Sequence, residues 1–229
     1  MHQRKGKKIL LYFFLLCLVG SINNNQFISI KFEEVKDVNV LGLGQRDNQS
    51  LLTEIKNLNL NNLFFINESQ INNLISSNNL VQDYEIFKRY PSTLDINIKK
   101  TKFLAKINHK KEIFLVGANG KLSNNNQNNN SLPFIFGKPK IHEFLNFKEI
   151  IDHSELSYEK VKNLYFYPSG RWDIELKDNR IIKLSSYFDK HTLNFVLDFL
   201  QNKNFRNTKV VDARTVSYTH LRAHETRHD

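Results

Sequence analysis

The chain opens with a basic segment followed by an uncharged apolar run. This combination constrains on which side of a membrane the rest of the chain can lie. Arg4, Lys5, Lys7 and Lys8 lie within the first eight residues, and residues 9–22 form a run of 14 residues without charge. A basic flank before an apolar run is typical of a membrane-targeting segment whose basic side stays in the cytoplasm. As a helix the run would be about 21 Å long, against about 30 Å of bilayer hydrocarbon.

Two interpretations of this segment remain open. One is a cleaved signal peptide, with its cleavage site near residues 19–21. The other is a short uncleaved anchor, whose Lys7 and Lys8 reach the interface while the bilayer thins around it. Both place residues 23–229 outside the cytoplasm. The only cysteine, Cys17, lies within the run. An internal disulfide and a cysteine-based zinc site are therefore excluded.

Charge and composition exclude further classes. The formal net charge is +10, but four of those charges fall in the first eight residues and the rest are spread among acidic residues. No nucleic-acid recognition motif accompanies them, so we expect no nucleic-acid partner. The hydrophobic fraction of 40%, with 18 Phe, is enough for a packed core. The length of 229 residues allows one large domain or two small ones.

Apolar periodicity predicts a βααββ unit in the first half of the chain. The predicted elements are strands at 27–32 and 35–40, a helix at 50–58, a helix beginning at Asn67, and strands at 81–89 and 93–99. Asn48 or Ser50 is expected to cap the first helix. The last two strands are expected to pair through residues 90–92, with Leu94, Ile96 and Ile98 on one face.

This unit resembles the POTRA domain of the FtsQ/DivIB family of cell-division proteins. The resemblance rests on "VNVLGLG" (38–44), "LNLNNLFFINESQINNLI" (58–75) and "YEIFKRYPSTLDINIKK" (84–100). The family signature positions here are Gly42, Arg89, Pro91, Thr93 and Leu94.

The second half resembles the β-domain of the same family. Strands are predicted at 103–108, 112–116, 161–167, 171–176 and 180–184, and helices at 141–151 and 191–202. "LPFIFG" (132–137) and "GRWDIELKDNRIIKL" (170–184) resemble family elements, with a low-complexity loop at 124–130 between the halves of this domain. Residues 209–214 resemble the final "vDLR" strand, with Ala213 in place of Leu. Gly117 stands where the family usually has Asp.

The tail after Arg214 differs from the rest of the chain. His220, His224 and His228 recur every four residues, which on a helix would give a metal-like face. "VSYTHLRAHETRHD" instead resembles translated sequencing-adapter sequence, so no function is assigned to residues 215–229.

The resemblance implies an α+β protein with a single N-terminal membrane helix. Its expected parts are a cytoplasmic stub at 1–8, a membrane anchor at 9–22, a POTRA domain at 27–100 and a mixed β-domain with flanking helices at 101–214. It implies a single-pass protein of the bacterial inner membrane, with its bulk in the periplasm and concentrated at the division septum. The resemblance also favours an uncleaved anchor.

The resemblance further implies a scaffold that links early and late divisome proteins. Its expected partners are membrane proteins of the FtsB and FtsL type, bound outside the cytoplasm. In the family the last strand of the second domain accepts a partner strand. Val210, Val211, Asp212 and Arg214 match the start of that strand, which an open sheet edge would make available for β-augmentation.

The sequence offers no sign of an enzyme. It has no Gly-rich phosphate loop, no Gly-Xaa-Ser-Xaa-Gly and no His pair at metal spacing inside the predicted fold. We therefore expect no catalytic residue, metal, cofactor or small-molecule substrate. Two alternatives remain: a POTRA-containing envelope assembly factor, which would usually carry repeated POTRA units or a barrel pattern, and a secreted enzyme or binding protein with a cleaved signal.

Overall fold

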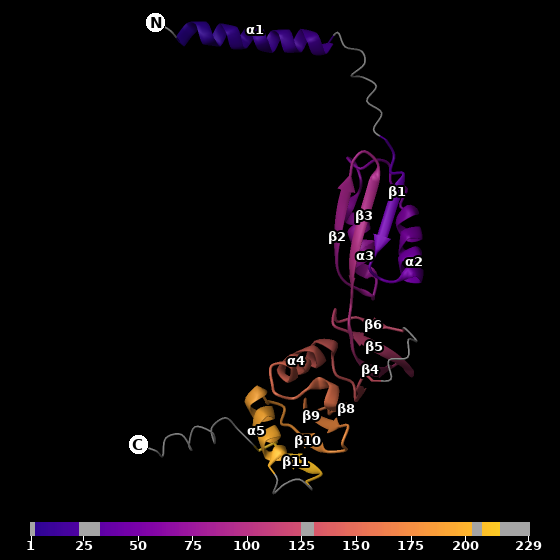
Figure 1. The fold of residues 1–229 in the computed structure, drawn as a ribbon, viewed down its shortest axis with the longest axis vertical. Helices are drawn as coiled ribbons and strands as arrows, with labels where there is room; N and C mark the ends of the chain where they lie inside the picture. The colour runs from indigo at the N-terminus through magenta and orange to yellow at the C-terminus, as the bar shows by residue number, and fades with distance from the viewer. Residues whose placement is uncertain (1–2, 23–32, 125–130, 203–207, 216–229) are drawn as a thin grey trace.

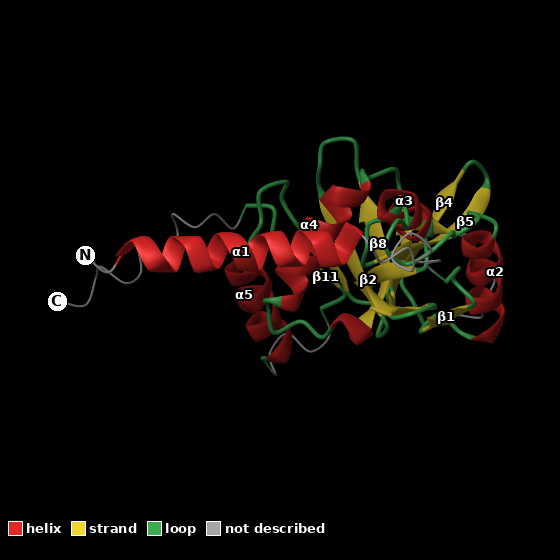
Figure 2. Ribbon diagram, turned by 90° about the horizontal axis from the view of Figure 1, so that it is seen from above, coloured by secondary structure: helices red, strands yellow, loops and turns green. Residues whose placement is uncertain are grey.

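The computed structural model describes residues 3–22, 33–124, 131–202 and 208–215, and shows an N-terminal helix followed by two α+β domains (Figure 1). The strand expected at 27–32, most of the loop at 124–130 and nearly all of the tail at 215–229 lie outside the described residues. In Figure 2 the strands lie between α2, at the far right of the view, and α5, left of centre.

The N-terminal helix α1 (Gln3–Ile22) contains the apolar run. Its large side chains from Ile9 to Val19 are exposed. Within the described ranges, no helix combines the length and the apolar character that crossing a membrane requires. The predicted α+β class is confirmed, whereas its membrane helix is not.

The first domain has the predicted βααββ order. Its elements are β1 (Asp37–Leu41), α2 (Gln45–Lys56), α3 (Glu68–Ser77), β2 (Val81–Arg89) and β3 (Thr93–Lys100). The sheet order is β1-β3-β2, with β1 parallel and β2 antiparallel to β3. The alternation in β3 buries Leu94, Ile96 and Ile98 against the two helices, as predicted. A parallel β1 needs a crossover, which α2 and α3 supply.

The start of α2 corrects the prediction. The helix begins at Gln45 and its N-cap is Gly44, neither Asn48 nor Ser50. Asn48 lies inside the first turn, where its Oδ1 accepts a hydrogen bond from the backbone N–H of Leu43 at 3.0 Å. The side chain therefore stabilises the turn before the helix. By contrast, α3 begins directly after Asn67, whose side chain accepts from the N–H of Gln70.

Gly42 marks a close approach between two strands. Its φ is +116°, and a Cβ built there would lie 1.7 Å from the carbonyl oxygen of Ile98 on β3. Only glycine fits both the backbone angle and the contact. Gly44 has the same φ of +116°, but a Cβ there would meet nothing within 4 Å.

The second domain is an eight-stranded sheet with helices packed on one face. Its elements are β4 (Phe103–His109), β5 (Glu112–Gly117), β6 (Leu122–Ser123), β7 (Phe134–Phe136), α4 (Ile141–Asp152), the 3-10 helix η2 (Tyr158–Lys160), β8 (Val161–Phe166), β9 (Trp172–Leu176), β10 (Ile181–Lys183), α5 (Lys190–Gln201) and β11 (Val210–Asp212). The strand order is β11-β10-β9-β8-β7-β4-β5-β6.

The core of this domain forms around Trp172. Its ring stacks on Phe147 of α4 at 4.3 Å between centroids and is 4% exposed. Ile174 and Leu176 share its face and are buried, as their alternation predicts. From α5, Leu193, Val196 and Leu200 close the same core.

The chain passes from the first domain to the second through residues 101–102, between β3 and β4. The buried Thr101 receives a hydrogen bond from the N–H of Asn119, and its own hydroxyl donates to Gln82. The side-chain amide of Asn119 donates to the carbonyls of Asn79 and Val81 at 3.0 and 2.8 Å. A Cβ at Gly117 would lie 2.4 Å from Asn119 Oδ1. The glycine therefore leaves room for this clamp between the domains.

We expect Gly42→Ala to destabilise the first domain by at least about 2 kcal/mol more than Gly44→Ala, measured as free energy of unfolding in urea. Both substitutions place Ala at a φ of +116°, so the strain that comes from φ is matched. Only the substitution at 42 adds the collision with the Ile98 carbonyl. Equal losses of stability in the two variants would contradict the steric argument.

Candidate partner-binding edge

The strand β11 forms one edge of the eight-stranded sheet. It pairs in parallel with β10, with Val210 opposite Ile181 and Asp212 opposite Lys183. The structure therefore places Val210, Val211, Asp212 and Arg214, the four residues predicted for partner binding, along or just after this edge. They lie on consecutive positions of a single segment.

The pairing determines which backbone groups face outward. The N–H of Ile181 donates to the carbonyl of Lys209 at 2.8 Å, and the N–H of Ala213 donates to the carbonyl of Lys183 at 2.9 Å. Positions 209 and 213 thus face β10. Because backbone groups alternate sides along a strand, the N–H and C=O of Val210 and Asp212 point to the open edge.

An apolar groove of about 300 Å³ runs beside this edge, between α5 and β11. Phe195, Val196 and Phe199 of α5 form one wall, and Thr208 with residues 210–213 forms the other. Phe195 and Val210 are 47% and 45% exposed. A strand added at the edge would carry side chains that can enter this groove.

The charged residues of the edge pair with each other. Arg214 Nε donates to both carboxylate oxygens of Asp212, at 2.7 and 3.0 Å, and a second guanidinium nitrogen also contacts Asp212. These hydrogen bonds lower the pKa of Asp212 to about 2. The segment therefore ends in a fixed ion pair at neutral pH.

Two groove residues escaped the sequence analysis. The sequence predicted a helix at 191–202, but Phe195 and Phe199 were not singled out. Their signal was available: two aromatic residues four positions apart lie outside the buried set Leu193, Val196 and Leu200. An apolar pair outside the core stripe of an amphipathic helix indicates a contact surface.

The signature residues of the first half do not gather at the β11 edge, because they belong to the first domain. Arg89 donates to Asp95 at 2.9 Å, and Asn39 donates to the same carboxylate at 2.8 Å, so the three strands are tied across the solvent face. These hydrogen bonds lower the pKa of Asp95. Leu94 is fully buried, Thr93 lies opposite both Arg89 and Asp37, and Pro91 lies in the β2–β3 turn.

The predicted topology residues all lie in α1. Arg4, Lys5, Lys7 and Lys8 occupy its first part, and Lys7 and Lys8 are exposed. They belong to α1 and are therefore not part of the β11 edge.

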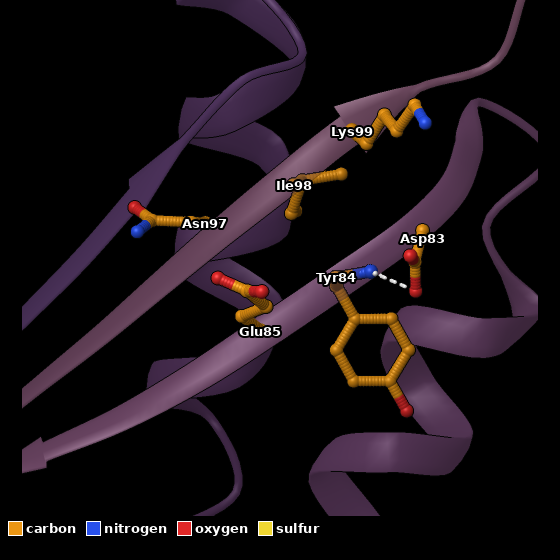
Figure 3. A pocket seen from close by; sticks show the side chains of 6 residues that line it. All are labelled: Asp83, Tyr84, Glu85, Asn97, Ile98 and Lys99. Carbon is orange, nitrogen blue, oxygen red and sulfur yellow. Dashed lines mark hydrogen bonds between the residues drawn. The ribbon is translucent and has the colours of Figure 1, made fainter.

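A shallow hollow of about 270 Å³ on the first domain is a weaker candidate (Figure 3). It lies on β2 and β3, and it is lined by Asp83, Tyr84, Glu85, Asn97, Ile98 and Lys99. Tyr84 contributes to packing: its hydroxyl donates to Asn72 of α3 at 3.1 Å, and its N–H donates to Asp83. The remaining groups do not converge on a point, so the hollow offers no defined ligand chemistry. In the described part of the chain, no group of three His, Cys, Asp or Glu could hold a metal ion.

Comparisons with known proteins agree on one family. Residues 34–100 match the family model for the FtsQ-type POTRA domain. The chain is 28% identical over 103 residues to the cell division protein DivIB of Clostridium tetani. That match covers 45% of this chain and 37% of the relative, so the chain spans just over a third of the relative's length.

A solved structure also matches in part. It is the major extracytoplasmic domain of the trans isomer of the cell-division protein DivIB from Geobacillus stearothermophilus. The match has 13% sequence identity and a TM-score of 0.35, and covers 48% of this chain and 99% of the other.

We expect Arg214→Ala to raise the pKa of Asp212 from about 2 toward its ordinary value of 3.8. The hydrogen bonds from Arg214 are the largest cause of the lowered value, so their loss stabilises the protonated carboxyl relative to the carboxylate. An NMR titration of the Asp212 carboxyl carbon measures the shift. Lys209→Ala, which removes a nearby cation without a contact to this carboxylate, serves as the control. An unchanged Asp212 pKa in Arg214→Ala would contradict the assignment.

Proposed function

We propose that this chain, which matches the FtsQ-type POTRA model over residues 34–100 and is similar to a DivIB protein, is a non-enzymatic scaffold that links early and late proteins of the division machinery. Residues 27–100 and 101–214 would be its two extracytoplasmic domains. The tail at 215–229 has no part in the proposal.

The observation that carries the proposal is the open edge of β11 beside an apolar groove. Outward-facing N–H and C=O groups of Val210 and Asp212 supply the hydrogen bonds for an added strand. The groove beside them selects for apolar side chains in the added strand. Successive residues of a strand point alternately to its two faces, so every second side chain can enter the groove. Backbone pairing and a lateral apolar groove together suit a partner peptide better than a small molecule.

The partners that fit this chemistry are single-pass division proteins of the FtsB and FtsL type. Such proteins present an extracytoplasmic segment next to the same membrane. A segment that binds here would be extended, with an apolar residue for the groove lined by Phe195 and Phe199.

The proposed topology is bitopic, with residues 1–8 in the cytoplasm, residues 9–22 in the inner membrane and the bulk in the periplasm. Four basic residues precede an apolar run whose side chains are exposed over the described helix. That charge order favours a cytoplasmic N-terminus. The short run requires local bilayer thinning, at a modest cost per ångström of mismatch.

We expect Val210→Pro to weaken binding of an FtsB-type extracytoplasmic segment about tenfold or more, measured by calorimetry on the full chain. Proline removes an N–H that faces the open edge and leaves the bonds of Lys209 and Ala213 to β10 in place. Phe195→Ser, which opens the groove wall, should weaken binding in the same direction. Both variants should keep the thermal unfolding midpoint close to that of the parent.

Phe136→Ser is the matched control, because Phe136 is 44% exposed in the same domain but lies on β7, away from the groove. It should bind like the parent chain. Parent-like binding by both edge variants, with folding intact, would rule out β11 as the binding strand.

We expect the chain, fused to a fluorescent protein that folds outside the cytoplasm, to form a band at the division site of growing cells. In the family that the chain resembles, the POTRA domain serves recruitment to the division site, so Gly42→Ala, which destabilises that domain, should disperse the band. Val210→Pro should leave it in place. A uniform membrane signal from an intact parent fusion would contradict the division role and favour general envelope assembly.

A further inference from the structure

Three aromatic side chains project from one end of the first domain. Phe64 and Phe65 lie in the connection between α2 and α3, and Tyr90 lies in the turn between β2 and β3. They are 58%, 72% and 55% exposed. The rings of Phe64 and Tyr90 are in contact, 4.7 Å apart. We call these three residues the aromatic end.

The local structure holds these rings outward. Asn62 Oδ1 accepts hydrogen bonds from the N–H groups of Phe64 and Phe65, at 3.0 and 3.1 Å. The residue between, Leu63, is fully buried in the domain core. The chain therefore anchors one apolar side chain inside and presents the next two to the outside. The two hydrogen bonds to Asn62 and the burial of Leu63 together hold the turn in one conformation.

The aromatic end lies where the chain enters the domain. The N–H of Val35 donates to the carbonyl of Asn61 at 3.0 Å, and the N–H of Lys36 donates to the carbonyl of Ser92 at 2.9 Å. Residues 33–36 are thus bound to both aromatic segments. In Figure 1 this is the end of the first domain that lies away from the second domain.

The chain length keeps this end near α1. Eleven residue steps separate Ile22, the last residue of α1, from Glu33. A fully extended chain would cover at most about 40 Å over that distance. Whatever surface holds α1 is therefore within reach of the aromatic end at a high effective concentration.

We propose that the aromatic end docks on the lipid headgroup region of the membrane that holds α1. The inference rests on the bitopic topology proposed above. Tyr is enriched at this depth, where its ring meets acyl chains and its hydroxyl meets water, and Phe side chains of interfacial surfaces also insert there. The domain would then stand with its entry end on the bilayer and its other end, followed by the second domain, directed away.

The charges around the aromatic end favour lipid over a charged protein partner. Lys36 pairs with Glu33 at 3.0 Å, and Lys88 pairs with Glu68 at 2.5 Å. These two cations are thus paired within the domain, so their attraction to an acidic protein partner is weak. Insertion of exposed rings into an interface needs no such attraction.

The test uses the full chain reconstituted in vesicles of phosphatidylethanolamine and phosphatidylglycerol. Cys17→Ser removes the native thiol, and Asn61→Cys, an exposed position beside the rings, carries an NBD fluorophore. Ser77→Cys, exposed at the C-terminal end of α3, carries the control label. Doxyl-labelled phosphatidylcholine in the vesicles quenches a fluorophore that lies at the membrane.

The expected result is about twofold quenching at position 61 and little at position 77. Adding Phe64→Ser and Phe65→Ser should abolish the quenching at 61 while circular dichroism stays unchanged. Equal, weak quenching at both positions in a chain that floats with the vesicles would overturn the docking and leave the topology standing. A chain that fails to float would overturn the topology and the docking together.

Discussion

The arrangement of the whole molecule depends on a junction of two residues. Because only residues 101–102 separate β3 from β4, the second domain has little freedom unless the contacts beside the junction break. Asn119 prevents this by binding Thr101 through its backbone and the carbonyls of Asn79 and Val81 through its side chain. These three hydrogen bonds, two of them part-buried, all form in one arrangement, so the clamp favours one relative orientation of the domains. The absence of a side chain at Gly117 makes the clamp possible.

A fixed junction gives the two proposed surfaces a defined separation. The aromatic end lies where the chain enters the first domain, and β11 lies at the far end of the second domain (Figure 1). If the first surface rests on lipid, the second is held at a set height above the membrane. A partner strand anchored in the same bilayer would then have to extend over that height before it could pair with β11. The junction would thus help to select partners by the length of their extracytoplasmic segment.

Local sequence signals predicted those features that depend on local physics. Alternation identified Leu94, Ile96 and Ile98 as core, since the two-residue period of a strand leaves no other face. The start of α2 was missed because the side chain of Asn48, a good capping residue, bonds to Leu43 instead. The clamp of Asn119 could not be predicted, because its partners lie about forty residues earlier in the chain. The groove was missed because it needs the packing of α5 against β11, which no periodicity specifies.

One small side chain, Ala213, lines that groove. Ala213 is 1% exposed and lines the groove with Val196 and Phe199, at the position where the resembling family strand carries Leu. A leucine there would add three carbon atoms to the wall of a space of about 300 Å³. Since protein interiors tolerate few empty spaces, an apolar space left at the surface is more stable when another chain fills it. If a partner strand pairs with β11 as proposed, the shorter residue leaves room beside Val196 and Phe199 for one of its side chains.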